Sequence, residues 1–214
     1  MPMGFEVGIA SVAEVALIAE WAAREGWNPG RTVALDGVVA QQPNYRRSGF
    51  RPAWTTTRFE GAPPIPDPPA GIGLVDARAV PFDALAAFDR RHFGAPRDAF
   101  LAAWISLAER HALVAMTDAG IVGFAVLRRA PAAARLGPVF ASDAEVATAL
   151  VSALAHESGA QNVAVDAPGI NPRAAAWAES LGWTPTFETA RMYTGPAPTI
   201  DTDGLFGITS LELG

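Results

Sequence analysis

The sequence has no cysteine and no lysine among its 214 residues, so all sixteen of its basic residues are arginine. Without cysteine, the chain can form no disulfide, no thiolate metal site and no cysteine nucleophile. Without lysine, it has neither a Schiff-base residue nor the lysine of a phosphate-binding loop. The net charge is -6 and no dense basic run is present, so nucleic acid is not an expected partner. His92, His111 and His156 lack the close spacing of metal ligands, and no metal site is expected.

We expect neither a targeting segment nor a membrane-spanning segment from the sequence. The first residues carry Glu6, Glu14 and Glu20 without a basic stretch, unlike a secretory signal. No apolar run reaches the roughly 18 residues that a membrane-spanning helix needs. We therefore expect a cytoplasmic protein with no membrane partner. Half of the residues are hydrophobic, which is enough for a substantial core.

A proline-rich stretch divides the chain into two unequal parts. Residues 63–71 contain five prolines, which predict a stiff linker. We expect a partial domain over residues 1–62 and a second domain over residues 72–214. In the first part the pattern predicts a helix over 12–25, a turn over 27–30, a strand over 31–35, a helix over 41–48 and a strand over 50–59.

The second part alternates helices and strands in the order typical of an α/β protein with one mixed sheet. Ser142 and Asn171 are expected to cap two of its helices, and residues 90–92 are expected to lie on a solvated helix face. The predicted strands are 73–78, 112–116, 121–127, 135–140, 162–166, 187–193 and 208–213, and the predicted helices are 82–93, 97–110, 142–156 and 172–181.

The two parts share an internal repeat in which a strand, a helix, a Gly-aromatic-x-Pro turn and a second strand follow one another. Convergent packing of α/β units is the alternative explanation. Only 32 residues precede the first copy, whereas about 90 separate the linker from the second. We therefore expect about 60 residues to be missing between Gly30 and Arg31. The matching segments are VALD (33–36) and VAVD (163–166), GFRP (49–52) and GWTP (182–185), and TTR (56–58) and TAR (189–191).

These residues resemble the GNAT acyltransferase superfamily, and their order is similar to that of bacterial proteins with two tandem GNAT-like domains. The likeness rests on ALDGVVAQQPNYRRSGF (34–50), on TTRFEG (56–61) and on most of the chain from residue 112 to residue 195. It implies a mixed sheet flanked by helices, as a tandem duplication with an incomplete first copy. It also implies acetyl-CoA-dependent transfer of an acyl group to a small-molecule or protein amine.

The resemblance assigns roles to four residues. Tyr45 matches the tyrosine that serves as general acid in the family, with packing of the short helix as the alternative. Val139 and Ala141 lie where the family binds the pantetheine arm of acetyl-CoA. Asn171 is in place to bind the cofactor, although a helix cap also explains it. The position that matches Tyr45 in the second copy is Ala178.

The cofactor loop of the second copy departs from the family pattern. Residues 141–145 contain no glycine and no arginine, and Asp143 and Glu145 would repel a pyrophosphate there. Asp36 and Asp166 end equivalent strands, where they either orient a substrate amine or serve the structure.

Two functions therefore stay open from the sequence. One is an N-acyltransferase, and the other is a non-catalytic GNAT-fold module for ligand binding or dimerisation. The sheet edge that the missing segment would leave unpaired predicts a homodimer.

Overall fold

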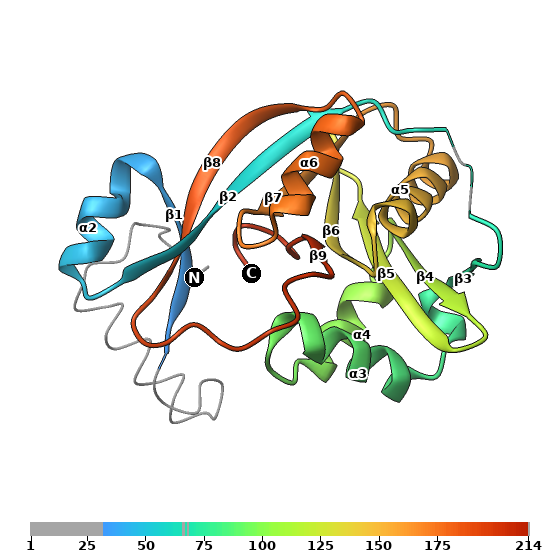
Figure 1. The fold of residues 1–214 in the computed structure, drawn as a ribbon, viewed down its shortest axis with the longest axis horizontal. Coiled ribbons are helices and arrows are strands. Elements are labelled where there is room, and N and C mark those ends of the chain that lie inside the picture. The colour runs from blue at the N-terminus through green and yellow to red at the C-terminus, as the bar shows by residue number, and fades with distance from the viewer. Residues whose placement is uncertain (1–31, 66, 68, 214) are drawn as a thin grey trace, which may run out of the picture.

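The structure of the protein is a computed structural model that describes residues 32–65, 67 and 69–213. These residues form one mixed sheet with helices on both faces (Figure 1). The helix expected over 12–25, the turn over 27–30 and the junction between Gly30 and Arg31 lie outside the described residues. Within the described part of the chain, no helix is both long and apolar enough to cross a lipid bilayer.

Strands and helices follow one another largely as the sequence patterns predict. The sheet order is β1-β8-β2-β7-β6-β5-β4-β3, with β9 paired to β6. Strands β6 and β7 pair in parallel, and the other strand pairs among the described residues are antiparallel. The strands are β1 (Ala34–Val38), β2 (Arg51–Gly61), β3 (Gly73–Asp76), β4 (Arg110–Thr117), β5 (Gly120–Arg128), β6 (Ala134–Ala141), β7 (Val163–Pro168), β8 (Thr184–Tyr193) and β9 (Leu205–Gly207). The helices are α2 (Gln42–Arg47), α3 (Phe82–Phe93), α4 (Asp98–Ser106), α5 (Ala144–Ser158) and α6 (Pro172–Ser180), with short 3-10 helices η1 (Val39–Gln41) and η2 (Ala77–Ala79).

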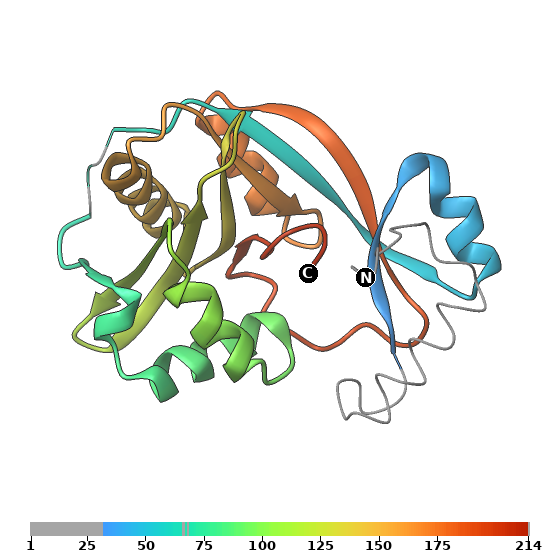
Figure 2. The same cartoon turned by 180° about the vertical axis from the view of Figure 1, so that it is seen from behind.

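Strand β2 lies in the middle of the sheet, although it precedes the proline-rich linker in sequence. It pairs with β7 along one edge and with β8 along the other. Figures 1 and 2 show β2 and β8 as two long curved strands, which join β1 and α2 to the rest of the molecule. The division into domains 1–62 and 72–214 stays a prediction, but both parts contribute strands to one continuous sheet.

The two strand–helix–strand copies, β1–α2–β2 and β7–α6–β8, have the same local geometry. Each helix is followed by a glycine with positive φ, 89° at Gly49 and 74° at Gly182, a conformation that costs glycine little. The next residue donates its amide to the carbonyl five residues back, at 3.0 Å from Phe50 and 3.1 Å from Trp183. The sequence repeat is therefore also a structural repeat.

The pairing of β2 with β8 aligns the two copies about an approximate twofold axis. Thr56 lies directly opposite Thr189, the matching residue of the other copy. On either side, β1 pairs with β8 and β7 pairs with β2, both antiparallel. A rotation about this axis superposes β1 on β7 and β2 on β8. The last strand of each copy therefore pairs with the first strand of the other copy.

Two buried ion pairs connect the copies on opposite sides of this axis. The guanidinium of Arg58 in the first copy binds the carboxylate of Asp166 in the second at 2.7 Å. In the reverse sense, Arg191 of the second copy binds Asp36 of the first at 2.6 Å. These four residues are the matching aspartates and arginines of the sequence repeat.

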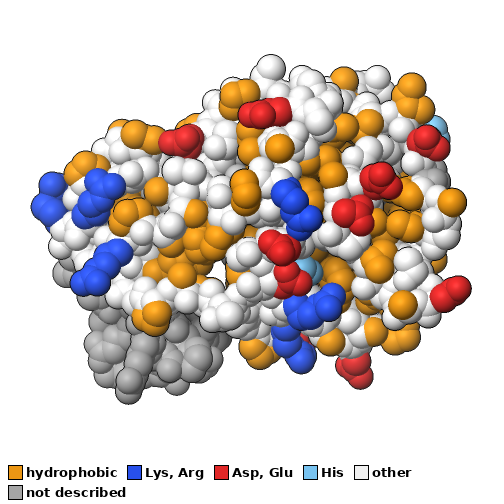
Figure 3. Space-filling model, in the orientation of Figure 1, with side chains coloured by type: hydrophobic (Ala, Val, Ile, Leu, Met, Phe, Trp, Pro, Cys, Tyr) orange, Lys and Arg blue, Asp and Glu red, His pale blue; other side chains and the backbone are white. Residues whose placement is uncertain are grey.

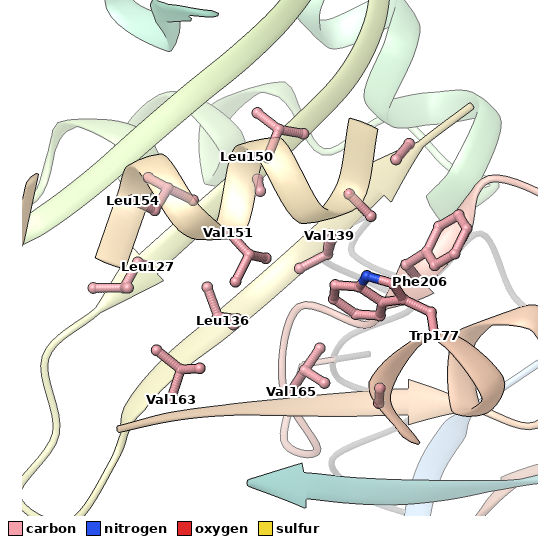
Figure 4. Packing of buried hydrophobic residues seen from close by; sticks show 14 of the residues in the cluster. Leu127, Leu136, Val139, Leu150, Val151, Leu154, Val163, Val165, Trp177 and Phe206 are labelled. Atoms are coloured by element: carbon pink, nitrogen blue, oxygen red, sulfur yellow. The ribbon is translucent and has the colours of Figure 1, made fainter. Parts of the chain in front are cut away.

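The hydrophobic core lies on both faces of the sheet. The apolar residues of α5 recur every three or four positions and pack against β4, β5 and β6, and Figure 4 shows Leu150, Val151 and Leu154 of this helix in the cluster. On the opposite face, α3 and α4 cover Phe124 and Phe140. A third, small cluster contains Phe50, Ala190 and Met192, with Tyr45 packed against it.

The expected cap of α5 is wrong by one residue. Asp143 caps the helix, because its carboxylate accepts the amide of Val146 at 2.9 Å. The hydroxyl of Ser142 instead donates to this carboxylate at 2.8 Å.

Two further element boundaries differ from expectation. The helix expected over 97–110 ends at Ser106, since Leu107 has an extended backbone. The strand expected over 208–213 is also wrong. Strand β9 lies just before this segment, which turns back on itself through a bond from the Leu213 amide to the Ser210 carbonyl at 3.2 Å.

Substitution of Asp166 by alanine is predicted to destabilise the protein by about 2 kcal/mol, because it removes both carboxylate hydrogen bonds of the partly buried Arg58 guanidinium. The Asp98→Ala variant is the control. It breaks an ion pair with Arg90 whose side chains are about half exposed, so we expect a loss of about 0.5 kcal/mol or less. Urea unfolding measures both changes, and equal losses would contradict the prediction.

Candidate functional site

Strands β6 and β7 separate part-way along their length. They are paired over Ala134–Leu136 of β6, and beyond this point β6 pairs with β9 instead. Gly207 of β9 lies opposite Val139, and the amide of Ala141 donates to the carbonyl of Gly204 at 2.9 Å. Residues of the same chain thus fill the gap between the two parallel strands.

The filled gap is tightly packed. Phe206 is fully buried against Trp177, with ring centroids 5.6 Å apart (Figure 4). A Cβ atom at Gly207 would lie 2.6 Å from the Val165 side chain. The arrangement leaves no room for a pantetheine arm, so this groove does not fit acetyl-CoA while β9 occupies it. The assignment of Val139 and Ala141 to cofactor binding stays a prediction.

Asn171 supports the segment that fills the gap. Its side-chain oxygen accepts the Arg173 amide at 3.1 Å, which confirms the expected cap of α6. Its side-chain nitrogen donates to the carbonyls of Asp203 and Leu205 at 3.2 and 3.1 Å. Asn171 therefore ties α6 to the start of β9, and its role in cofactor binding stays a prediction.

Tyr45 packs under the short helix α2. Its ring forms an edge contact with Phe50, with centroids 6.3 Å apart. A Cβ atom at Gly37 would lie 3.0 Å from the Tyr45 ring, so the glycine lets this ring lie against β1. Since side chains alternate along a strand, Gly37 and Tyr45 lie on the opposite face of the sheet from Asp36. The catalytic role of Tyr45 stays a prediction.

A pocket opens on the other face of β2 and β8. It has an empty volume of about 380 Å³, including its open mouth. Figure 3 shows that the molecule is hollowed near its centre, where hydrophobic side chains gather along one side of the opening. The pocket is lined by Trp54 of β2, Arg191 and Tyr193 of β8, His92 and Phe93 of α3, Phe140 of β6, and Pro198, Ile200, Leu205, Ile208 and Thr209 of the C-terminal segment.

Burial keeps two titratable residues of the pocket uncharged. His92 is 4% exposed, and its Nδ1 lies 3.0 Å from the carbonyl oxygen of Asp201. The expectation that His92 faces solvent is therefore wrong, because the C-terminal segment covers it. Burial lowers the pKa of His92 and raises the pKa of Tyr193, so both are neutral at pH 7.

The carboxyl of Asp36 lies behind Arg191 with a side chain that is 1% exposed. Burial raises its pKa from 3.8 to about 6, although the charge of Arg191 opposes this shift. Asp166 and Glu212 add smaller contributions that raise it further. Asp36 is thus ionised at neutral pH, but it takes up a proton at a higher pH than an exposed aspartate does.

Sequence reasoning missed the pocket residues Trp54, Arg191 and Tyr193. A signal was present in the strand expected over 187–193, where Thr189, Arg191 and Tyr193 alternate with Ala190 and Met192. Such alternation indicates that one face of this strand is not part of an ordinary apolar core.

Comparison with known proteins identifies the family. A model of the acetyltransferase (GNAT) domain matches residues 85–207, more than half of the chain. The chain belongs to the GNAT acetyltransferase family. A curated relative is holothin acyltransferase of Pseudoalteromonas sp. (strain SANK 73390), which is 33% identical over 186 residues. The match covers 86% of this chain and 63% of the relative, so the chain spans less than two thirds of that protein's length.

Solved structures show the same GNAT fold. A protein from Pyrococcus horikoshii, named as an acetyltransferase, matches with a TM-score of 0.75 at 20% identity, over 95% of this chain and 66% of its own. A tandem GNAT protein from the clavulanic acid biosynthesis pathway matches with a TM-score of 0.52 at 16% identity, over 86% and 70%. The expected mixed sheet flanked by helices is confirmed, while an incomplete first domain stays a prediction.

The raised pKa of Asp36 predicts how stability depends on pH. The folded protein binds the Asp36 proton at higher pH than the unfolded chain does, so this group favours folding less as the pH rises from about 4 to about 6. Relative to the Asp36→Asn variant, the wild type should lose up to about 3 kcal/mol over this range. Urea unfolding of both proteins at several pH values measures the difference, and parallel stability curves would contradict it.

Proposed function

We propose that the protein transfers an acyl group from a CoA thioester to an amine of a small molecule. Membership of the GNAT family carries this proposal, and the 33% identity to holothin acyltransferase supports it. The separating parallel strands β6 and β7 are a further feature shared with the family that the sequence resembles.

The reaction sets clear demands on the protein. The neutral amine nitrogen attacks the thioester carbonyl carbon, a C–N bond forms, and the C–S bond breaks. The amine nitrogen loses a proton and the thiolate leaving group gains one, so a proton acceptor and a proton donor are needed. In this proposal Tyr45 is the proton donor.

The acyl donor binds against the first copy in this proposal. The groove between β6 and β7 is filled by β9, and the capping carboxylate of Asp143 would repel a pyrophosphate at the start of α5. The repeat makes β1 the counterpart of β7, and Tyr45 lies beside β1. Among the described residues β1 pairs with β8 alone, and in this proposal the acyl donor binds along its other edge.

The acyl acceptor binds on the Tyr45 face of the sheet in this proposal, because the attacking amine and the proton donor must both reach the thioester, whereas the pocket lined by Trp54 and Arg191 lies on the opposite face. Because the relative is named as a holothin acyltransferase, holothin is the first amine to assay.

Thiol release tests this function with no background from the protein, since the chain contains no cysteine. Incubation with acetyl-CoA and an amine should release free CoA thiol at a rate that depends on both substrates. The Tyr45→Phe variant should lower kcat about 100-fold, the loss typical of a missing general acid. Its melting temperature, measured as the control, should stay close to that of the wild type.

Two results bear differently on the proposal. Unchanged turnover in Tyr45→Phe would remove the proton-donor assignment alone. The function itself would be contradicted if neither acetyl-CoA nor longer acyl-CoA thioesters released thiol with any amine and none raised the melting temperature. A ligand at one hundred times its Kd should stabilise the protein by about 2.7 kcal/mol, so binding would be visible.

A further inference from the structure

Two partly buried arginines face each other across the sheet without a carboxylate partner. Arg110 of β4 lies directly opposite Arg128 of β5 in the strand register. Among the described residues, neither side chain forms an ion pair. In the same part of the chain, every other arginine that is not exposed binds a carboxylate, namely Arg58, Arg97, Arg135 and Arg191.

The two arginines belong to a row of charges that crosses the sheet. Arg128 also lies opposite Arg135 of β6, so three arginines follow one another on β4, β5 and β6. The row continues past Ala164 of β7 to Glu60 of β2, whose carboxylate lies 3.2 Å from the Arg135 guanidinium. Glu60 therefore offsets the charge of Arg135 and leaves the other two arginines uncompensated.

The surrounding charges do not balance this row. Burial and the charge of Arg128 both lower the pKa of Arg110. Glu212 of the C-terminal segment interacts electrostatically with Arg128 and Arg58, but it forms an ion pair with neither. Like charges that lie directly opposite each other destabilise a sheet. The row therefore has an excess of positive charge that an anion between Arg110 and Arg128 would relieve.

Both guanidinium groups remain within reach of a ligand from solvent. One nitrogen of each, Arg110 Nη1 and Arg128 Nε, is covered and has no hydrogen-bond partner, so a ligand contacts the other nitrogens. The two side chains are only partly buried. The guanidinium carbon of Arg110 lies 3.5 Å from the centre of the Trp104 ring of α4, and this stacking holds the group in place.

We propose that Arg110 and Arg128 together bind a phosphate group, either as the free ion or as the phosphate of a small monoester. A guanidinium donates two parallel hydrogen bonds to the oxygens of a phosphate or a carboxylate. The two oxygens of a carboxylate are occupied by one such group, whereas a tetrahedral phosphate presents further oxygens to the second. A bound phosphate also supplies the negative charge that the row lacks.

This site is separate from the places that the proposed function assigns to its substrates. Strand β6 ends at Ala141, just before α5, so Arg135 and the row lie at the other end of β6 from the start of that helix. Tyr45 belongs to the first copy of the repeat. The inference therefore does not rest on the proposed function. Phosphate binding without acyl transfer would support this inference alone, and acyl transfer without phosphate binding would support the function alone.

Titration with inorganic phosphate at constant ionic strength tests the site, when proton–nitrogen NMR follows the arginine Nε–H signals. Saturable shifts are expected for Arg110 and Arg128. Acetate should bind about tenfold more weakly, because its two oxygens satisfy one guanidinium only. Methyl phosphate distinguishes the two sources of the group. Binding at least as tight as that of phosphate assigns the site to monoesters, and weaker binding assigns it to the free ion.

Substitutions in the row test which residues hold the phosphate. Arg110→Gln and Arg128→Gln each remove one guanidinium and should weaken phosphate binding about tenfold. The matched control is Arg129→Gln, because Arg129 is the next residue along the chain and donates to the Ser158 carbonyl at 3.0 Å. Salt screens its exposed charge, so this variant should change the affinity less than about twofold.

Melting temperatures in phosphate-free buffer provide a second test. Arg128→Met keeps an apolar side chain of similar length but removes the charge, so it should melt at a higher temperature than the wild type. Arg135→Met should melt at a lower temperature, because Glu60 loses its partner. Added phosphate should then raise the melting temperature of the wild type more than that of Arg128→Met. This comparison removes the general stabilisation that phosphate gives to folded proteins.

Several results would overturn the inference. They are the absence of saturable shifts at Arg110 and Arg128, equal affinity for acetate and phosphate, and an equal loss of affinity in Arg128→Gln and Arg129→Gln. Arg110→Gln decides the matter if the Arg128 variants do not fold. A lower melting temperature of Arg128→Met in phosphate-free buffer would also contradict the inference, since it would show that the protein itself compensates this charge.

Discussion

Two buried aspartate–arginine pairs, Asp36–Arg191 and Asp166–Arg58, fix how the two copies of the repeat join. Each pair takes its aspartate from one copy and its arginine from the other. A slip of β2 by one residue would turn Arg58 to the opposite face of the sheet and leave Asp166 buried without its partner. The pairs therefore set the register of β2 between β7 and β8. The continuous sheet, the pocket and the placement of α2 all depend on this register.

The space between the two parallel strands of the sheet is not open in this protein. The parallel strands β6 and β7 diverge, but β9 and the buried Phe206 fill the space between them. The cavity that remains lies instead where β2 and β8 face α3 and the C-terminal segment. Its polar wall comes from both copies of the repeat, because Trp54 belongs to the first copy and Arg191 to the second. The wall of this cavity therefore forms where the two copies of the repeat meet.

The sequence patterns predicted where helices and strands form better than they predicted which elements pack against one another. Apolar spacing located α5, the repeat located β1–α2–β2 and β7–α6–β8, and Asn171 was correctly expected to cap a helix. The position of β2 between β7 and β8 could not be predicted, because the β-branched and aromatic residues of 51–61 indicate that a strand forms but not which strands it pairs with. Strand β9 was missed because three residues carry no periodic signal, and His92 was misplaced because the segment that covers it lies more than 100 residues away in sequence.

Native-state hydrogen exchange of the β2 amides can decide whether the two parts form one cooperative sheet. If they do, the paired amides of residues 54–60 exchange only through global unfolding, with the same free energy as the core of β5 and β6. Exchange of these amides through a local opening, while β5 and β6 stay protected, would contradict that view. It would show that the first part is docked onto an independently stable second part.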